Sequence, residues 1–591
     1  MLFKKGEKYM KKLISLLLCI IMLMGVTVIP AFASDKASKS FGEKAGDLFA
    51  RGLGGVVHGI TAGINFLMRE NDSFIPEENY TYDNFYQGTA EFIKEAKQGA
   101  VWSLGKAEAS LLPENYEEYS LYLGGFLTGG NGFKNDLREI LDDMKVRVIA
   151  LNDGSGRGTT VFATVDAIGV SNGDIRQIRA MLSDFAKEND INAINIFATH
   201  AHSCIDTQGL WTDIQHKWPK NFLHAFTGIG ESVQGTDEKY MEFFRDAVKT
   251  AIEKAAASME KGKMTYAEKE LPRYFSNKNR QSATAMDSMI RRIAFYPENE
   301  KSTPTFIVNM SAHPDVAGLA VKDDPVKGHG LSGDYVYYMG ETLNELGYDF
   351  MFFNGAICGI YIGRPDVNTD RRVEIPAGYG KEVAQITYAM TMTEEEILAD
   401  EKLMSFNFTA EQTEGHDDFY LWHENWEATE EKELEPILNL RLKTVELQAT
   451  NPVIKVAAKL GLVNYRIKKT ADKDYFITTE IGFMEIGRSL RFVFAPGELC
   501  ADLAWGGDSL KAHGSVSGKD FEGRTLNEIF GSEDNPVIVL GLANDAIGYI
   551  VPDNDYSMCL GMGHYHETLS LGRNTASTLI KAYEELATEL V

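Results

Sequence analysis

The pattern that most restricts the fold of this chain is an alternation of apolar runs and amphipathic segments that begins near residue 145. Three runs are typical of β-strands: "KVRVIALND" (145–153), "TTVFATVDAIGV" (159–170) and "INAINIFATH" (191–200). The segment between the last two is typical of a helix, because apolar side chains recur every three or four positions after a cap formed by Ser171 and Asp174. Strands and helices in this order predict an α/β fold.

The alternation continues toward the end of the chain. Further strands are expected in 303–312, 348–356, 488–496 and 535–545, and a final helix in 574–590. The acidic segments 391–408 and 424–436 are expected to form exposed helices. We therefore predict one domain over residues 116–591, built as a large mixed sheet system flanked by helices.

The charge of the chain limits its partners. The 591 residues are 44% hydrophobic, which allows a large core, and their formal net charge is -26. A chain this acidic has no broad basic face, so nucleic acid is not an expected partner and long-range attraction to anionic lipid is weak. A neutral or cationic small molecule fits better. No protein partner is predicted, and contact with a membrane surface stays open.

The N-terminus is typical of an export signal. Lysines precede the apolar run "LISLLLCIIMLMGVTVIP", and "AFAS" offers a cleavage site after Ala33, so residues 1–33 are expected to be removed. The alternative is an uncleaved membrane anchor, because the run approaches the length that spans a bilayer. Either way, the protein is expected to be secreted or associated with the cell envelope.

Residues 34–115 are predicted to form an N-terminal extension. A Gly-rich apolar stretch at 47–67 contains Gly55, Gly59 and Gly63, a spacing of small residues that permits close helix packing in a membrane. A segment docked on the main domain is the other interpretation of this stretch.

Residue types that bind metal ions follow several of the predicted strands: His200 and His202 after "INIFAT", His313 after "FIVNMSA", Glu498 after "LRFVFAPG" and Tyr549 after "VIVLGLANDAIG". Strand ends in α/β sheets present side chains to a crevice. Two imidazoles and a carboxylate form a standard zinc-binding set, and zinc lowers the pKa of a bound water to near neutrality. Each residue alone could be ordinary polar structure, so the prediction depends on the combination.

Four segments resemble motifs of the neutral (non-lysosomal) ceramidases and occur in the same order. "NIFATHAHSCIDT" is similar to the T-H-T-H-S-G segment of that family, "SAHPDVAG" to its single-His segment, "APGELCADLAWGG" to its P-G-E-F-T segment and "NDAIGYIVPDNDY" to its N-x-Y-x-x-Y-x-T-x-E-E-Y segment. "NKNRQS", "LSGDYVYYMGE" and "GHYHETLSLG" resemble three further motifs. The resemblance runs from about residue 145 to the C-terminus and implies zinc-dependent hydrolysis of an N-acyl bond.

The resemblance also assigns roles to single residues. It implies a zinc ion with four ligands: His200, His313, Glu498 and Tyr549. It further implies that His202 and Arg280 orient the amide or its oxyanion, and that Tyr565 lies near the scissile group. Phenol oxygen beside a divalent cation is favoured as phenolate, which makes a tyrosine ligand chemically reasonable.

One segment departs from the family. The nucleophile of the ceramidases lies in a G-D-V-S-P-N segment, where this chain has "NGAICGIY", with Ala356 at the aspartate position, Cys358 at the serine position and Gly359 at the proline position. Cys358 could be a thiolate nucleophile, a hydrogen-bond donor to a reaction carried out by zinc-activated water, or an inert buried residue. We favour the zinc-activated water.

Two smaller departures concern the remaining cysteines and the C-terminus. The segment "CIDT", which begins at Cys204, stands where the family has a Gly-Pro-Gly turn, and Cys204 could be a further ligand or a buried thiol. With Cys358, Cys500 and Cys559 it forms neither a disulfide scaffold nor a zinc ribbon, and pairing stays open. The chain ends at Val591, where the family continues into an immunoglobulin-like β domain, so that domain is expected to be absent.

Two hypotheses follow. The first is an exported zinc-dependent amidase that hydrolyses ceramide or a related N-acylated lipid, by zinc-activated water or by an active-site nucleophile. The alternative is a catalytically silent ceramidase-like protein that acts as a binding or surface-interaction module, which the changed "NGAICGIY" segment favours. The four proposed ligands together with Arg280 favour the enzyme, because a binding module has no need of an open metal position.

Overall fold

The computed structural model describes residues 59–81, 85–125, 136–212, 214–277, 280, 282–317, 330–363, 374–405, 422–423, 425–558 and 564–590. The predicted export signal and most of the Gly-rich stretch lie outside these residues. Within the described ranges, no helix is both long enough and apolar enough to cross a membrane.

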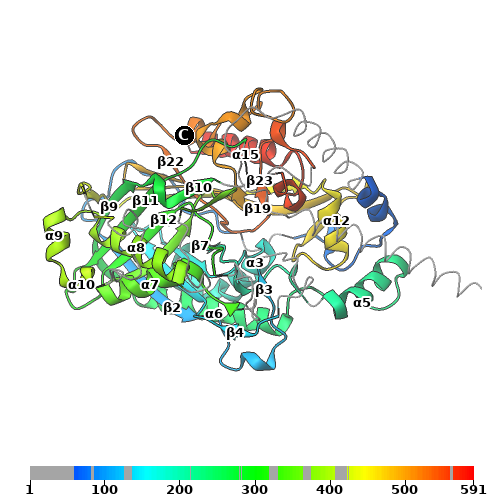
Figure 1. Cartoon of the computed structure of the whole chain (residues 1–591), viewed down its shortest axis with the longest axis horizontal. Helices are drawn as coiled ribbons and strands as arrows, with labels where there is room; N and C mark the ends of the chain where they lie inside the picture. The colour runs from blue at the N-terminus through cyan, green and yellow to red at the C-terminus, as the bar shows by residue number, and fades with distance from the viewer. Residues whose placement is uncertain are drawn as a thin grey trace, which may run out of the picture.

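Two large sheets form the centre of the molecule (Figure 1). The nine-stranded sheet has the order β14 (Asp349–Asn354), β12 (Thr305–Met310), β11 (Met289–Pro297), β9 (Glu260–Glu270), β2 (Trp102–Ser110), β5 (Lys145–Asn152), β6 (Thr159–Val165) and β7 (Ile191–Ala198), with β16 (Lys432–Leu434) paired to β9. The six-stranded sheet has the order β1 (Phe74–Pro76), β18 (Ile467–Lys469), β19 (Tyr475–Ile486), β20 (Leu490–Phe494) and β22 (Val537–Leu540), with β17 (Leu438–Gln448) paired to β19. Both sheets are mixed, since β12–β14, β6–β7 and β20–β22 are parallel pairs among antiparallel ones.

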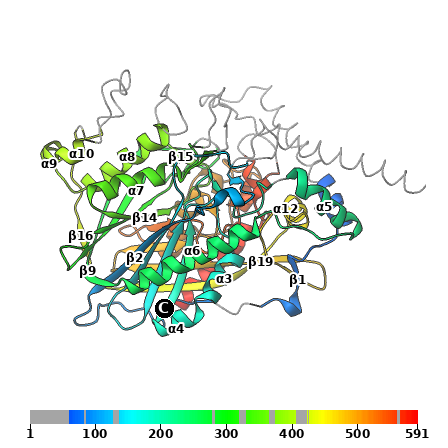
Figure 2. The same ribbon diagram turned by 90° about the horizontal axis from the view of Figure 1, so that it is seen from below.

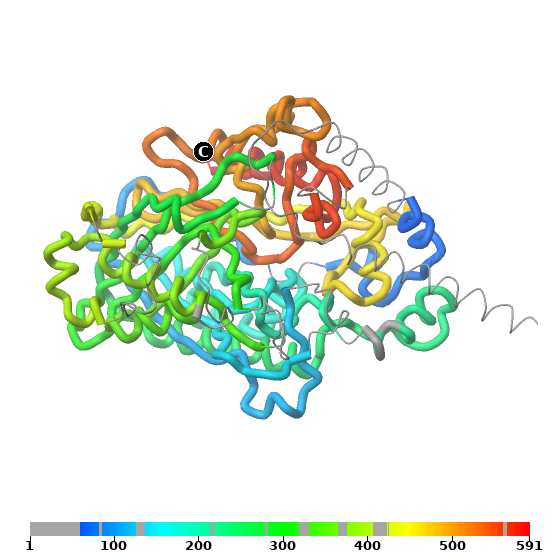
Figure 3. The backbone as a smooth tube through the Cα atoms, in the orientation of Figure 1, coloured from blue at the N-terminus to red at the C-terminus, as the bar shows by residue number. Residues whose placement is uncertain are grey.

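Helices cover the outer face of each sheet (Figure 2). The nine-stranded sheet packs against α3 (Asn172–Met181), α4 (Ser183–Glu188), α6 (Glu238–Ala257), α7 (Asp334–Leu346) and α8 (Glu374–Ala389). The six-stranded sheet packs against α12 (Pro452–Lys459), α13 (Ala501–Trp505), α14 (Leu526–Phe530) and α15 (Thr575–Glu589). The tube in Figure 3 shows the orange and red C-terminal part on one side of the molecule and the cyan and green part on the other. The predicted α/β class, a mixed sheet system flanked by helices, is confirmed.

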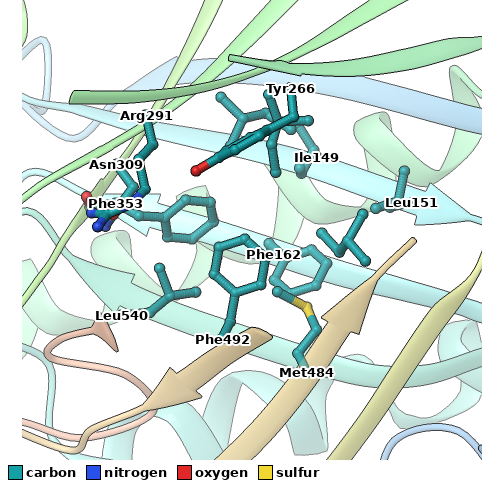
Figure 4. Close-up of a pocket in the computed structure, with 13 residues that line it drawn as sticks. Ile149, Leu151, Phe162, Tyr266, Arg291, Asn309, Phe353, Met484, Phe492 and Leu540 are labelled. Carbon is teal, nitrogen blue, oxygen red and sulfur yellow. Dashed lines mark hydrogen bonds between the residues drawn. The ribbon is translucent and has the colours of Figure 1, made fainter. Parts of the chain in front are cut away.

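The inner faces of the two sheets share one apolar core. Phe162 and Phe353 from the nine-stranded sheet and Phe492 and Phe494 from the six-stranded sheet belong to this cluster. Central strands are therefore buried on both faces, which explains why their sequences are continuous apolar runs rather than an alternation of apolar and polar residues. A small cavity remains between the sheets, and none of the predicted site residues lines it (Figure 4).

Most of the predicted elements are present, with two corrections. The helix expected after Ser171 begins as predicted, with the Ser171 side chain accepting from the Asp174 N–H, but Leu182 divides it into α3 and α4. The helix expected in 424–436 is wrong, because this segment supplies β16 to the edge of β9. The final helix is confirmed as α15. Strands β1 and β2 show that residues 74–76 and 102–110 pair within the two large sheets.

Short elements connect the sheets and carry side chains to their ends. Four two-stranded pairs are formed by β3 (Leu123–Gly124) with β8 (Cys204–Ile205), β4 (Glu139–Ile140) with β13 (Gly330–Leu331), β10 (Phe275–Asn277) with β15 (Ile360–Ile362), and β21 (Glu498–Leu499) with β23 (Tyr549–Ile550). Further helices are α5 (Ile214–Thr227), α9 (Glu394–Ala399) and α10 (Glu401–Met404). The pairs β3–β8, β10–β15 and β21–β23 surround the candidate site.

Candidate metal centre

Three histidines meet where strands of the nine-stranded sheet end. His200 and His202 follow β7, and His313 follows β12. One nitrogen atom from each ring lies within 4.8 Å of the other two, and the ring centroids are 4.7, 4.9 and 5.5 Å apart. The elements that carry them lie in the middle of the molecule (Figure 1). This spacing of imidazole nitrogens is compatible with coordination of one ion.

Backbone carbonyls orient two of the three rings. His200 Nδ1 lies 2.7 Å from the carbonyl oxygen of Ile168, and His313 Nδ1 lies 2.7 Å from that of Ile360. A ring that donates from Nδ1 has its lone pair at Nε2, which is the tautomer that binds metal ions. The Nε2 atoms of both histidines face the centre of the cluster.

Glu498 contacts both of these Nε2 atoms. Its Oε2 lies 3.0 Å from His313 Nε2 and 3.3 Å from His200 Nε2. Burial opposes the carboxylate charge, but the two imidazoles outweigh it and hold the pKa of Glu498 well below its usual range. Burial, together with His200 and His313, lowers the pKa of His202 well below its usual value, so this ring is neutral at pH 7. Neutral imidazole and ionised carboxylate are the forms that bind metal ions.

The donor set fits a divalent ion of intermediate softness. Imidazole nitrogens with one carboxylate oxygen suit zinc, and among the described residues no lysine or arginine pairs with the buried carboxylate between the two imidazoles. The residues that could hold such an ion are therefore His200, His313 and Glu498, joined by His202, whose ring lies beside the other two.

The backbone at His200 is strained. His200 has a φ of 69°, in the left-handed region that residues with a side chain seldom adopt. The neighbouring chain holds it there, because Thr199 N–H donates to the Val165 carbonyl and His202 N–H donates to the Pro314 carbonyl. Strain of this kind collects at functional sites, since the surrounding structure has to maintain it.

Gly125 allows the β3 segment to approach His202 closely. Its φ is 136°, and a Cβ atom added to it would lie 2.5 Å from the Cα and Cβ atoms of His202. No side chain larger than hydrogen fits this position without moving the histidine.

We expect Gly125→Ala to displace His202 and, because this ring packs against those of His200 and His313, to weaken binding of Zn²⁺ about tenfold or more, as measured by calorimetry. Gly156→Ala is the matched control, because Gly156 also has a positive φ but nothing lies within 4 Å of an added Cβ. That variant should lose about 1 kcal/mol of unfolding free energy and keep its affinity for the ion. Equal affinities in the two variants would contradict a role for the close approach at Gly125.

Three tyrosines and a further histidine adjoin the cluster. Tyr549 pairs in register with Glu498 across β23 and β21. Its ring is perpendicular to those of Tyr565, at 5.8 Å, and His566, at 4.6 Å. Burial, followed by the charge of Glu498, raises the pKa of Tyr549 well above its usual value, so its phenol is neutral in the absence of a cation. Tyr361, which no motif had indicated, stacks on His313 and lies 3.1 Å from Tyr565, oxygen to oxygen.

Arg280 lies in a buried ion-pair network. Its guanidinium donates to Asp555 Oδ2 at 2.7 Å and to Glu567 Oε1 at 3.3 Å, and all three side chains are fully buried. Burial opposes the positive charge, but Glu567 and Asp555 outweigh it and raise the pKa of Arg280. The motifs do not indicate Asp555 or Glu567 as its partners. Glu567 lies in the turn that follows Tyr565, so the network supports the segment that carries this tyrosine.

The cysteines near the site are buried thiols. Cys204, Cys358 and Cys500 are free, and no disulfide forms among the described residues. Burial, followed by the proximity of Cys500, raises the pKa of the Cys358 thiol well above its usual value. Gly359 has a φ of 82°, which a proline ring cannot adopt, so this turn differs from one with proline at the same position.

Comparisons with known proteins support the fold. No family model matches the chain, and no curated protein matches it. Among solved structures, a ceramidase complexed with C2 aligns with a TM-score of 0.55 at 14% identity, over 83% of this chain and 75% of the other. The neutral ceramidase from Pseudomonas aeruginosa aligns with a TM-score of 0.51 at 13% identity, over 83% and 74%. The likeness to ceramidases expected from the motifs is thus confirmed in the fold, which most of the chain shares.

Proposed function

We propose that the chain is an exported zinc-dependent amidase that hydrolyses the N-acyl bond of ceramide or of a related N-acylated lipid. One observation carries the proposal: three imidazoles converge beside an ionised, buried Glu498 at the strand ends of a fold shared with ceramidase structures. A zinc ion bound there would polarise an amide carbonyl and lower the pKa of a water molecule.

In this proposal, the residues of the chain divide the work of the reaction. His200, His313 and Glu498 hold the ion, with Tyr549 as the fourth ligand. His202 is neutral, so it can donate one N–H bond to the oxygen on which negative charge develops. Tyr565 gives a proton to the leaving amine.

Arg280 receives a different task from the one that the motifs imply. Because its guanidinium is buried against Asp555 and Glu567, we assign it to the support of the Tyr565 segment rather than to direct contact with the oxyanion. The hydrogen bonds it already makes leave fewer N–H groups for a substrate.

The test combines metal analysis of the mature chain from Ser34 with an assay on a fluorescent N-acyl-sphingosine. We expect one Zn²⁺ per chain and amide turnover that a chelator removes and Zn²⁺ restores. A chain that binds no zinc contradicts the metal site. Zinc binding without turnover on any acyl chain length supports the second candidate, a silent binding module, which the buried thiol of Cys358 favours.

Cys358→Ser is expected to retain turnover within about threefold of the wild type. Its thiol is buried and held neutral, and a buried neutral thiol is a poor nucleophile. Cys358→Ala should have the same turnover as Cys358→Ser if the thiol only fills space. A loss of turnover in Cys358→Ala alone would indicate that the thiol donates a hydrogen bond. A loss of more than about a hundredfold in both variants, with zinc content unchanged, would identify Cys358 as the nucleophile.

A further inference from the structure

Tyr361 joins two parts of the candidate site that come from distant segments. It lies in β15, directly after the turn that contains Cys358 and Gly359. On one side it contacts His313, and on the other it contacts Tyr565, which is 204 residues further along the chain.

The contact with His313 fixes the plane of the imidazole. The two rings stack at 4.7 Å with an interplanar angle of 15°. The backbone reinforces this arrangement, because His313 pairs with Tyr361 in a parallel bridge and His313 N–H donates to the Ile360 carbonyl. A ring held by a stack and by a bond at Nδ1 cannot rotate about its Cβ–Cγ bond without losing both contacts.

The contact with Tyr565 fixes a phenol. The hydroxyl oxygens of Tyr361 and Tyr565 lie 3.1 Å apart, so one donates to the other. Tyr565 is also stacked on His566 at 4.0 Å and meets the edge of Tyr549 at 5.8 Å.

We propose that Tyr361 is a positioning residue of this site: its ring holds His313 in the orientation that binds the ion, and its hydroxyl holds Tyr565 in the orientation that donates to the leaving group. The proposal rests on the proposed amidase function for the second role, whereas the first role requires only the metal site. The two roles belong to different atoms of one side chain, so two substitutions separate them.

Tyr361→Phe keeps the ring and removes the hydroxyl. We expect kcat to fall about tenfold, with KM and affinity for Co²⁺ unchanged, because one hydrogen bond to Tyr565 is lost and the stack on His313 remains. Tyr361→Leu removes both contacts. We expect its affinity for Co²⁺ to fall tenfold or more and the visible absorption spectrum of bound Co²⁺ to change.

A double-mutant cycle identifies the path of the hydroxyl effect. If Tyr361 acts through Tyr565, adding Tyr361→Phe to Tyr565→Phe lowers kcat no further; a full additional tenfold loss would overturn this role. Tyr80→Phe is the matched control, because its hydroxyl donates to the Arg466 carbonyl at the surface, and it should leave kcat and Co²⁺ binding unchanged.

The two proposals fail separately. A wild-type chain without amide turnover refutes the amidase function and with it the hydroxyl role, while the Co²⁺ spectra still decide the ring role. Equal Co²⁺ affinity and equal spectra in Tyr361→Leu and the wild type would overturn the ring role, whatever the activity.

Discussion

His200→Ala and His313→Ala are each expected to abolish zinc binding and to lower kcat/KM on an N-acyl lipid at least a thousandfold. Each variant removes one of the Nε2 atoms that face Glu498, and leaves this buried carboxylate with a single imidazole. A metal ion contributes several kcal/mol of transition-state stabilisation, which corresponds to a loss of this size. Zinc per chain, measured on the purified proteins, and initial rates give the two readouts.

His513→Ala is the control for these variants. His513 is exposed and pairs with Asp508 at the surface, so its removal should change neither zinc content nor rate. Full zinc content in a double variant of His200 and His313 would show that the ion binds elsewhere. Full turnover in the same variant would show that the histidine cluster takes no part in the reaction.

The sequence predicts the framework of this molecule well where apolar runs are long. Strands such as β5 and β12 are buried on both faces, so their composition alone identifies them. The segment around β16 is different. Its glutamates favour an exposed helix, but it pairs with the edge of β9, and this tertiary contact outweighs local preference. Strand β2 was missed for a similar reason, since its place between β9 and β5 depends on segments far along the chain.

The candidate site also contains residues that the sequence predicts and residues that it does not. His200, His313 and Glu498 could be predicted because each comes directly after a strand or at the start of a short one, and the fold brings those ends together. The position of His202 beside the other two imidazoles could not be predicted, because it depends on a turn held by Pro314 and on the close approach of Gly125. Tyr361 lies in the quoted segment "NGAICGIY", but only the folded chain shows its contacts.

Arg280 is the predicted site residue whose buried partners the motifs did not indicate, and its replacement has the largest expected effect on stability. We expect Arg280→Met to lose about 3–5 kcal/mol of unfolding free energy at pH 7.5, as measured by urea denaturation, because it leaves Asp555 and Glu567 buried without the guanidinium that they share. Arg488→Met is the control. It removes an arginine whose ion pair with Glu435 is exposed, and it should change stability by less than about 0.5 kcal/mol.

The pH dependence tests whether this loss comes from the ion pairs. In the wild type, burial opposes the charge of Glu567, but Arg280 and His564 outweigh it and lower its pKa below the usual 4.5. A lowered pKa adds stability above the unfolded value, and this stability is lost as the pH falls through the folded value. In Arg280→Met the same carboxyl keeps His564 but loses the guanidinium and binds a proton more readily, so the variant should lose less as the pH falls. The difference in unfolding free energy between wild type and variant should therefore be largest near neutral pH and smaller at pH 4.5.

A difference that stays constant with pH would mean that Arg280 stabilises the Tyr565 segment by packing rather than by charge. If Arg280→Met loses amide turnover but keeps its stability, Arg280 contacts the oxyanion, as the motifs imply.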